Sequence, residues 1–328
     1  MLYVSSLAHY QRILVRAALI FQLGIALLPA SQLVLGAESD QFSERTSQLR
    51  NLPDHTAQVD AWINLRLERL RQGLRPWQDH RERLQMAREL FLLPIVPDLL
   101  SYIEQWLLDA QSPVETFRPG KMGIFSGVSP TDARMVYVFG LDPTLKLAGQ
   151  LVGTDKIGHF FSQGFQYYIH FLNQQPSLSE NDRIESLREL GYEQESGYLG
   201  LGTDGVFSRA DLASNWAGFE FWDALFDGDQ AYFRFSRQNR TWVQTRTFAF
   251  RDFVTPAWDE YLNPPLVRSR AMQLKLQQNI SEICKNPDVR KLLSEEAPPP
   301  VAPTPYLLLK RPEPGFAIQY GCKGAGHS

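Results

Sequence analysis

A histidine and an aspartate four residues apart are the first candidates for chemistry in this sequence. Asp155 and His159 belong to the run DKIGHF at 155–160. On a helix, residues four apart lie on the same side, so the carboxylate can fix the tautomer of the imidazole and raise its basicity. Such a pair suits a general base or a metal ligand. In the alternative interpretation, Asp155 caps the helix and His159 is a hydrogen-bonded core residue.

A second polar pair, Asp211 and Asn215, repeats this spacing, and Ala213, Ala217 and Gly218 give it a flank of small residues. Small side chains let another helix approach closely, because the distance between helix axes depends on the side chains at the contact. The sequence therefore predicts that the two polar faces meet across a tight helix pair.

The start of this second helix has two interpretations. Ser208 and Asp211 have the spacing of a capping box with a shorter acid in the last position, so Asp211 is either a cap or a site residue. Glu195 lies just before a glycine-rich loop. It either completes a set with His159 and Asp211 or is one of several solvated charges on its own helix.

Gly200, Gly202 and Gly205 form the pattern G-x-G-x-x-G. This pattern indicates a dinucleotide loop only after a buried strand, whereas residues 188–196 are charged and helical in pattern. We therefore expect no nucleotide cofactor, and the sequence names no other. The backbone amides of the loop can still hold an anion at the helix start.

Asp259 and Glu260 stand in a cluster of acids and aromatics at 258–264. Adjacent residues point to different sides of a helix, so these carboxylates are poor partners for paired acid–base work. We expect Trp258 and Leu262 in the core and a helix end at Asn263, which precedes a proline.

The counts of cysteine and histidine limit the metal chemistry. The chain has two cysteines and six histidines, which are too few for a cysteine-based zinc site and make a multi-histidine centre unexpected. In an exported chain, an isolated pair of cysteines predicts a disulfide, here between Cys284 and Cys322.

Residues 1–37 have the order of a secretory signal peptide. Arg12 and Arg16 precede an apolar stretch over 17–35, and Gly36 and Ala37 are small residues of the kind that a signal peptidase needs. We expect cleavage near Ala37 and a periplasmic protein. The alternative is an uncleaved anchor in the inner membrane, because the apolar stretch approaches the ~20 residues that span a bilayer.

The charge balance argues against a nucleic-acid partner. The 328 residues carry 33 Lys and Arg and 36 Asp and Glu, a net charge of −3 with both signs interspersed. A nucleic-acid binder needs a clustered basic face. The expected partner is an envelope component or a lipid, with peripheral contact to a membrane.

Hydrophobic spacing predicts a mainly α fold, a compact orthogonal helical bundle with a small β-hairpin and irregular connections. The expected order is a signal peptide at 1–37, a flexible lead-in at 38–56, a helical domain at 57–295 and a proline-rich tail at 296–328. Helices are expected over 62–70, 84–91, a segment starting near Pro97, 155–172, 179–195, 208–226, 252–262 and 267–285. A hairpin turning near Asn239 is expected over 232–250, and 113–143 is expected to be irregular.

The pattern DKxxHF at 155–160 followed by SxxDLxxNxxG at 208–218 resembles the signature shared by VanZ-like proteins and the YfiM-type predicted envelope lipoproteins. The resemblance implies a bacterial envelope protein without an established reaction. This sequence lacks the further membrane helices of the former and the lipid-bearing cysteine of the latter, so neither feature is carried over. The residues that the resemblance marks are Asp155, Lys156, His159, Asp211, Asn215 and Gly218.

Two hypotheses for the function follow. The first is a hydrolase-like or metal-binding activity on an envelope component. The second is a non-catalytic periplasmic scaffold, or a lipid- or partner-binding protein, in which the same residues are caps and buried hydrogen bonds. For the first, the candidate catalytic residues are His159, Asp155, Asp211 and Glu195, and the candidate binding residues are Lys156, Asn215, Gly218 and Ser208.

Overall fold

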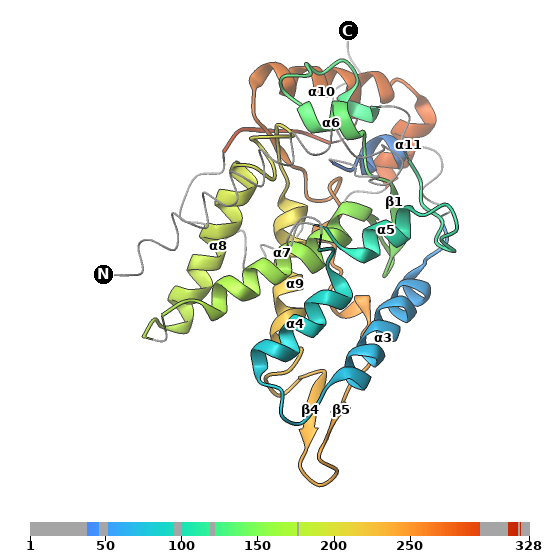
Figure 1. Cartoon of the computed structure of the whole chain (residues 1–328). Coiled ribbons are helices and arrows are strands. Elements are labelled where there is room, and N and C mark those ends of the chain that lie inside the picture. The colour runs from blue at the N-terminus through green and yellow to red at the C-terminus, as the bar shows by residue number, and fades with distance from the viewer. Residues whose placement is uncertain are drawn as a thin grey trace. The chain divides into compact units, whose positions relative to one another are not determined.

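The computed structural model describes residues 38–45, 52–94, 100–118, 122–175, 177–295, 314–320 and 322. Helices dominate and the sheets have only two or three strands, which confirms the mainly α fold (Figure 1). The predicted signal peptide, Pro97 and residues 296–313 of the predicted tail lie outside the described residues. None of the described helices is long and apolar enough to cross a membrane.

Three helices follow the N-terminal segment: α3 (Thr56–Gly73), α4 (His80–Phe91) and α5 (Tyr102–Leu108). Helix α5 begins later than expected because Ser101 caps it. The Ser101 hydroxyl accepts from the backbone of Glu104, and the Glu104 carboxylate accepts from the Ser101 backbone at 3.0 Å. This capping box, serine followed by glutamate three residues later, was readable from the sequence.

Helices α7 (Thr154–Leu172) and α9 (Arg209–Asp223) make the most extensive contact between elements. Their backbones nearly touch. A Cβ added to Gly218 would lie 1.9 Å from the carbonyl oxygen of Phe160, and one added to Gly164 would lie 2.6 Å from the Gly218 backbone. The predicted tight helix pair is confirmed, and Gly164 is the partner that the sequence did not indicate. Helix α8 (Glu180–Ser196) starts at its cap, Ser179, and packs on both.

The short strands connect these helices. The predicted hairpin is present as β4 (Phe233–Ser236) and β5 (Thr241–Gln244). A second hairpin, β1 (Thr144–Leu147) and β2 (Gln150–Gly153), was not predicted, and it leads directly into α7. The third sheet joins segments that are far apart in the sequence, and its strands are β3 (Val206–Phe207), β6 (Leu266–Val267) and β7 (Phe316–Ala317).

The predicted helix over 252–262 is wrong. The chain forms two 3-10 turns, η4 (Phe250–Asp252) and η5 (Pro256–Trp258), and then non-helical turns. Pro256 has no amide hydrogen for a helix interior, and Phe250, Phe253 and Trp258 all turn into the core. Helix α10 (Arg270–Ile283) begins three residues later than expected because Ser269 caps it. The remaining helices are α6 (Arg134–Phe139), α11 (Pro287–Glu295) and the 3-10 turn η3 (Gly123–Phe125).

Residues 38–42 are buried, whereas the sequence predicted a flexible lead-in. They precede and begin the short helix α2 (Gln41–Glu44). The Asp40 carboxylate accepts from the backbone of Ile124 at 2.8 Å, and Phe42 stacks on Tyr320 at 5.3 Å between ring centroids. Arg45 then pairs with the buried Asp259 at 2.8 Å. Each partner comes from a distant part of the chain, so local sequence could not reveal this packing.

The C-terminal segment 314–320 also packs against the helical body. Strand β7 pairs with β6, and Ile318 is buried. Cys284 and Cys322 form the predicted disulfide, with their Cα atoms 5.4 Å apart. The bridge therefore fixes the end of the chain to α10, which Cys284 caps.

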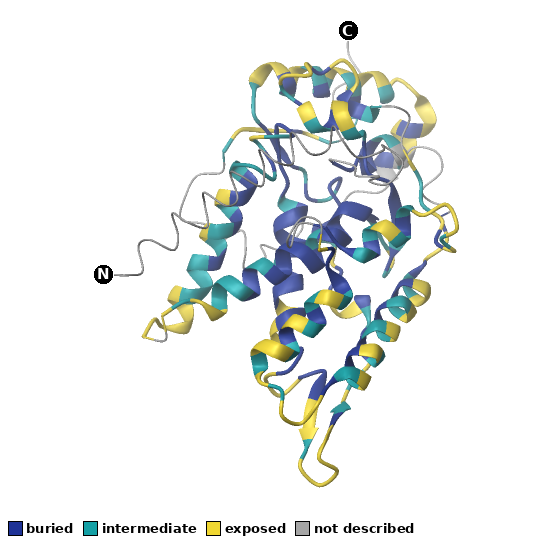
Figure 2. Ribbon diagram, viewed as in Figure 1, coloured by how far each residue is buried: buried dark blue, intermediate teal, exposed yellow. Residues whose placement is uncertain are grey.

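The buried side chains form two apolar clusters. The larger surrounds α7 and α9 and is rich in aromatic rings, and the smaller lies under α10 (Figure 2). Trp258 belongs to the larger cluster and Tyr261 to the smaller. Glu260 lies between them in the sequence, and its carboxyl group pairs with Lys156.

Candidate functional site

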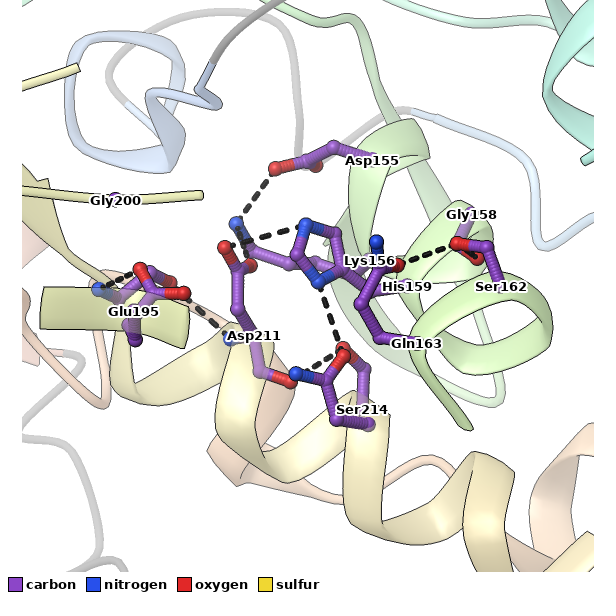
Figure 3. A network of polar contacts seen from close by, with 12 residues as sticks. Asp155, Lys156, Gly158, His159, Ser162, Gln163, Glu195, Gly200, Asp211 and Ser214 are labelled. Atoms are coloured by element: carbon purple, nitrogen blue, oxygen red, sulfur yellow. Dashed lines mark hydrogen bonds and ion pairs between the residues drawn. The ribbon is translucent and has the colours of Figure 1, made fainter. Parts of the chain in front are cut away.

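Lys156 lies at the centre of the charged network. Its side chain is fully buried, and its Nζ lies 2.6 Å from Asp155 Oδ2, 2.6 Å from Asp211 Oδ1 and 2.8 Å from Glu260 Oε1 (Figure 3). Burial by itself would lower the pKa of Lys156, but Asp155, Asp211 and Glu260 outweigh it and raise the pKa well above its usual value. The ammonium ion is therefore the internal counter-ion of three carboxylates.

The Asp155 carboxylate points to Lys156, and no interaction with His159 is found. The predicted pair of Asp155 and His159 is therefore wrong, because the adjacent ammonium attracts the carboxylate more strongly than a neutral ring would. The capping alternative for Asp155 also fails. The cap of α7 is Gly153, and no side chain bonds to that end of the helix.

His159 pairs with α9. Its Nδ1 lies 3.0 Å from Asn215 Oδ1, and its Nε2 lies 3.4 Å from Asp211 Oδ2 (Figure 3). Because the amide oxygen accepts, Nδ1 carries a hydrogen. The imidazole is 17% exposed, whereas Lys156, Asp211 and Glu260 are 5% exposed or less. His159 is thus the most exposed side chain of this group, followed by Asp155 at 11%.

Ser208 and Glu195 organise the start of α9. The Ser208 hydroxyl accepts from the Asp211 backbone at 3.1 Å, which confirms Ser208 as the cap. The Ser208 backbone donates to Glu195 Oε1 at 2.8 Å. In a capping box, the acid three residues after the cap would take this donor. Because Glu195 takes it, the carboxylate of Asp211 is available to Lys156 and His159.

The glycine-rich loop wraps around Glu195. A Cβ on Gly200 would lie 2.4 Å from Glu195 Oε1 and 2.2 Å from the Glu195 carbonyl oxygen. The acceptor at the start of α9 is therefore the carboxyl group of Glu195, which bonds to the Ser208 backbone. The loop follows helix α8 and precedes the two-residue strand β3, whereas the dinucleotide loop of this pattern follows a strand and opens a helix.

Acidic groups outnumber basic ones around Lys156. Burial raises the pKa of Glu38, Glu195 and Asp204 well above their ordinary values, and neighbouring carboxylates raise each further. Burial also raises the pKa of Asp211, but His159 and Lys156 outweigh it and lower the pKa. Asp211 is therefore the ionised partner of His159, while protons reside on other carboxyl groups of the network.

Three of these acids were not among the predicted site residues. Glu38 was assigned to the lead-in, Asp204 to the glycine-rich loop, and Glu260 to a helix that does not form. Ser208 donates its hydroxyl to Glu260 at 2.9 Å, which joins Glu260 to the cap of α9. A surplus of acids near one lysine is visible only once the chain is folded, so the sequence offered no signal for it.

A second group of buried acids lies beside the first turn of α7. The Glu104 carboxyl group packs on Gly158. A Cβ added to Gly158 would lie 2.1 Å from the carboxyl carbon of Glu104. Burial raises the pKa of Glu104 to about 7, against the hydrogen bonds from Ser101, and Asp155 raises it further. Burial together with Asp155 and Glu104 also raises the pKa of Asp142.

Because the pKa of Glu104 is raised, we expect the protein to lose stability as the pH rises from 5 to 8. Between its ordinary pKa of 4.5 and its folded pKa of about 7, the folded state holds a proton that the unfolded state has released. The free energy of unfolding therefore falls across this window, by about 3 kcal/mol for this group alone. Glu104→Gln removes the titrating group. Between pH 5 and pH 8, its free energy of unfolding, measured with denaturant, should therefore decrease by about 3 kcal/mol less than that of the wild type.

Glu82→Gln is the matched control, because Glu82 holds the same position in the capping box of α4 but is exposed. Its stability curve against pH should run parallel to that of the wild type. A parallel curve for Glu104→Gln would contradict the assignment of a buried, protonated Glu104.

The metal-binding alternative has no geometric support in the described part of the chain, where no group of three or more His, Cys, Asp or Glu side chains is placed to hold a metal ion. The position that a cation would take between the carboxylates is held by Lys156 Nζ. One oxygen of Asp211 thus faces the ammonium group and the other faces His159.

The fold and the site define a mainly α protein with a buried ion-pair network in which His159 is the most exposed side chain. Comparisons with protein-family models, with curated proteins and with solved structures found no match to this chain.

Proposed function

We propose that His159 acts as the general base of a hydrolase-like activity on an envelope component. The observation that carries the proposal is the pairing of a partly exposed imidazole with a buried, ionised carboxylate, His159 Nε2 to Asp211 Oδ2 at 3.4 Å. This distance is longer than a normal hydrogen bond, and the proposal requires a neutral His159 whose Nε2 accepts a proton from water.

Each neighbour of His159 has a part in this proposal. Asn215 fixes the tautomer in which Nε2 is basic. Asp211 stabilises the imidazolium that forms when Nε2 takes a proton from water. The resulting hydroxide equivalent attacks the substrate, and the imidazolium returns its proton to the leaving group. Lys156 and Ser208 act as positioning residues, because they hold Asp211 in place.

The charge of the network favours a neutral substrate. The Asp211 carboxylate, whose pKa is lowered by His159 and Lys156, lies 3.4 Å from His159 Nε2 and carries negative charge there. A phosphate ester would bring negative charge to this side and be repelled. Carboxylic esters, amides and glycosides carry no such charge, and we propose this class as the substrate.

The location outside the cytoplasm is part of the same proposal. Three observations support it: the leader-like sequence at 1–37, the disulfide between Cys284 and Cys322, and the resemblance to envelope proteins. A disulfide persists in an oxidising compartment such as the periplasm.

The test is His159→Ala, assayed with p-nitrophenyl butyrate as a neutral ester and p-nitrophenyl phosphate as its charged counterpart. The wild type should hydrolyse the ester in preference, and the variant should lose about 10²- to 10⁴-fold of that rate, the usual contribution of a general base. Its melting temperature should stay level, because a partly exposed side chain at a functional site contributes little to stability.

His170→Ala is the matched control. His170 lies at the other end of α7, is also partly buried, and bonds to Ser186 Oγ at 2.9 Å. Its loss should leave ester hydrolysis unchanged. Equal rates for wild type and His159→Ala would refute the proposal.

The alternative is a non-catalytic protein, and the burial of Lys156, Asp211 and Glu260 favours it. In that case the network only joins the two apolar clusters. His159→Ala would then leave Asp211 with one partner fewer and cost on the order of 1–3 kcal/mol, without any hydrolysis to lose. The melt and the assay together separate the two functions.

A further inference from the structure

The turn between α3 and α4 and the β4–β5 hairpin lie together at the end of the helical unit opposite α10 (Figure 1). Trp242 links them. Its Nε1 donates to the carbonyl oxygen of Arg75 at 3.3 Å, and its ring lies 5.7 Å from that of Phe235. The Arg83 guanidinium covers the same indole at 4.5 Å. We call Arg75, Trp77, Phe235, Arg237 and Arg240 the aromatic–arginine tip.

Two large aromatic side chains of this tip face solvent. Trp77 is 78% exposed and Phe235 is 37% exposed, whereas most aromatic residues of the chain are buried. Trp77 follows Arg75 and Pro76 in the turn, and no described ring stacks on it. Exposed apolar groups of this size that lie near one another mark an interaction site more often than isolated ones do.

The tip is basic in a chain that is acidic overall. Residues 230–246 contain four arginines and no Asp or Glu, and residues 69–78 contain three arginines and no acid, although the net charge is −3. Two of these arginines are paired with flanking acids, Arg71 with Glu68 at 2.6 Å and Arg246 with Asp252 at 3.7 Å, whereas Arg75, Arg237 and Arg240 make no ion pair with the described residues. Arg237 and Arg240 are exposed at the turn itself.

Arg240 occupies a backbone conformation that suits a different residue. Its φ is 49°, in the left-handed region that glycine and asparagine adopt most readily. The chain thus presents a charged side chain at a turn position where glycine would fold more easily. Such outliers gather at functional positions.

We propose that the aromatic–arginine tip docks on an anionic phospholipid surface, with Trp77 and Phe235 at the headgroup level and Arg237 and Arg240 against the phosphates. Tryptophan prefers the boundary between headgroups and acyl chains, and arginines near an anionic bilayer are attracted to it. The hairpin projects beyond the helices, as Figure 2 shows by its exposed colour. A projecting point suits a headgroup layer better than the extended basic face that a nucleic acid needs.

The experiment is sedimentation of the full chain with vesicles of phosphatidylglycerol and phosphatidylcholine in equal parts, compared with phosphatidylcholine alone. We expect at least tenfold tighter binding to the anionic vesicles at 0.1 M salt and a tenfold loss at 0.5 M salt. Trp77→Ser with Phe235→Ser should weaken binding about tenfold, and so should Arg237→Gln with Arg240→Gly. Arg240→Gly also relieves the backbone, so unfolding cannot explain its loss of binding.

Leu274→Ser and Lys285→Gln are the controls, because both lie on or next to α10 at the opposite end, and Leu274 is 55% exposed. They should bind as the wild type does, and so should His159→Ala, which separates this proposal from the hydrolase. Unchanged binding of both tip variants would overturn the proposal. Equally tight, salt-sensitive binding to a single-stranded oligonucleotide would overturn it as well and assign the tip to polyanions in general.

Discussion

Replacing Lys156 with methionine is expected to lower the free energy of unfolding by about 3–5 kcal/mol. Methionine keeps most of the length of the side chain, so packing changes little. The three carboxylates within 2.8 Å of Nζ, those of Asp155, Asp211 and Glu260, lose their shared counter-ion while they stay buried. Leaving charges buried and uncompensated is the costly outcome, whatever the intact network contributes in net terms.

The loss should also depend on pH. Without Lys156, these carboxyl groups must take up protons in the folded state, which costs more at pH 8 than at pH 5. Denaturant unfolding of Lys156→Met at both pH values measures this. A larger loss at pH 5 than at pH 8 would contradict the assignment of Lys156 as their counter-ion.

Lys285→Met is the matched control for the substitution. Lys285 also pairs with a carboxylate, Glu282 at 2.7 Å, but both side chains are more than half exposed. Exposed pairs of this kind contribute about 0–1 kcal/mol. A similar loss in both lysine variants would mean that burial is not the cause.

Replacing Gly218 with alanine is expected to cost about 3 kcal/mol or to prevent folding. The new Cβ would lie 1.9 Å from the carbonyl oxygen of Phe160, and that oxygen belongs to the backbone of α7. Backbone atoms inside a helix cannot move aside alone, so α7 and α9 must separate. Alanine favours helix formation by about 1 kcal/mol over glycine, which offsets only part of this cost.

Gly73→Ala provides the comparison, because Gly73 is also helical and a Cβ there meets only the terminal methyl of Met86 at 2.5 Å. A flexible side chain can move, so this variant should be as stable as the wild type or more so. Circular dichroism melts of both variants measure the difference. Equal stability of Gly218→Ala and the wild type would contradict the close approach of α7 and α9.

Separation of the two helices should also affect the site. His159 is on α7, and its two partners, Asp211 and Asn215, are on α9. Any Gly218→Ala protein that does fold should therefore lose ester hydrolysis together with stability. This effect links the candidate chemistry to a glycine that carries no functional group.

Much of the scaffold was predictable because its signals are local. Helical spacing of apolar residues located α3, α4, α7, α8 and α9, and the small residues of α9 indicated a close neighbour. The hairpin at 233–244 followed from its alternating pattern. The helix predicted over 252–262 failed because long-range aromatic packing and a proline at 256 outweighed the spacing of Trp258 and Leu262.

The sequence alone indicated the longer helices and that His159 and Asp211 belong to facing helices, because spacing and small residues act over a few positions along the chain. The tertiary structure decided which charges meet. In the folded protein, Asp155 pairs with Lys156 and not with His159. Glu260 and the buried Glu38 also lie near Lys156. Glu195 accepts from the Ser208 backbone at the start of α9. Ion pairs form between whichever groups come within about 4 Å after folding. Residues 38 and 260 are too far apart in the chain for any local pattern to place them together.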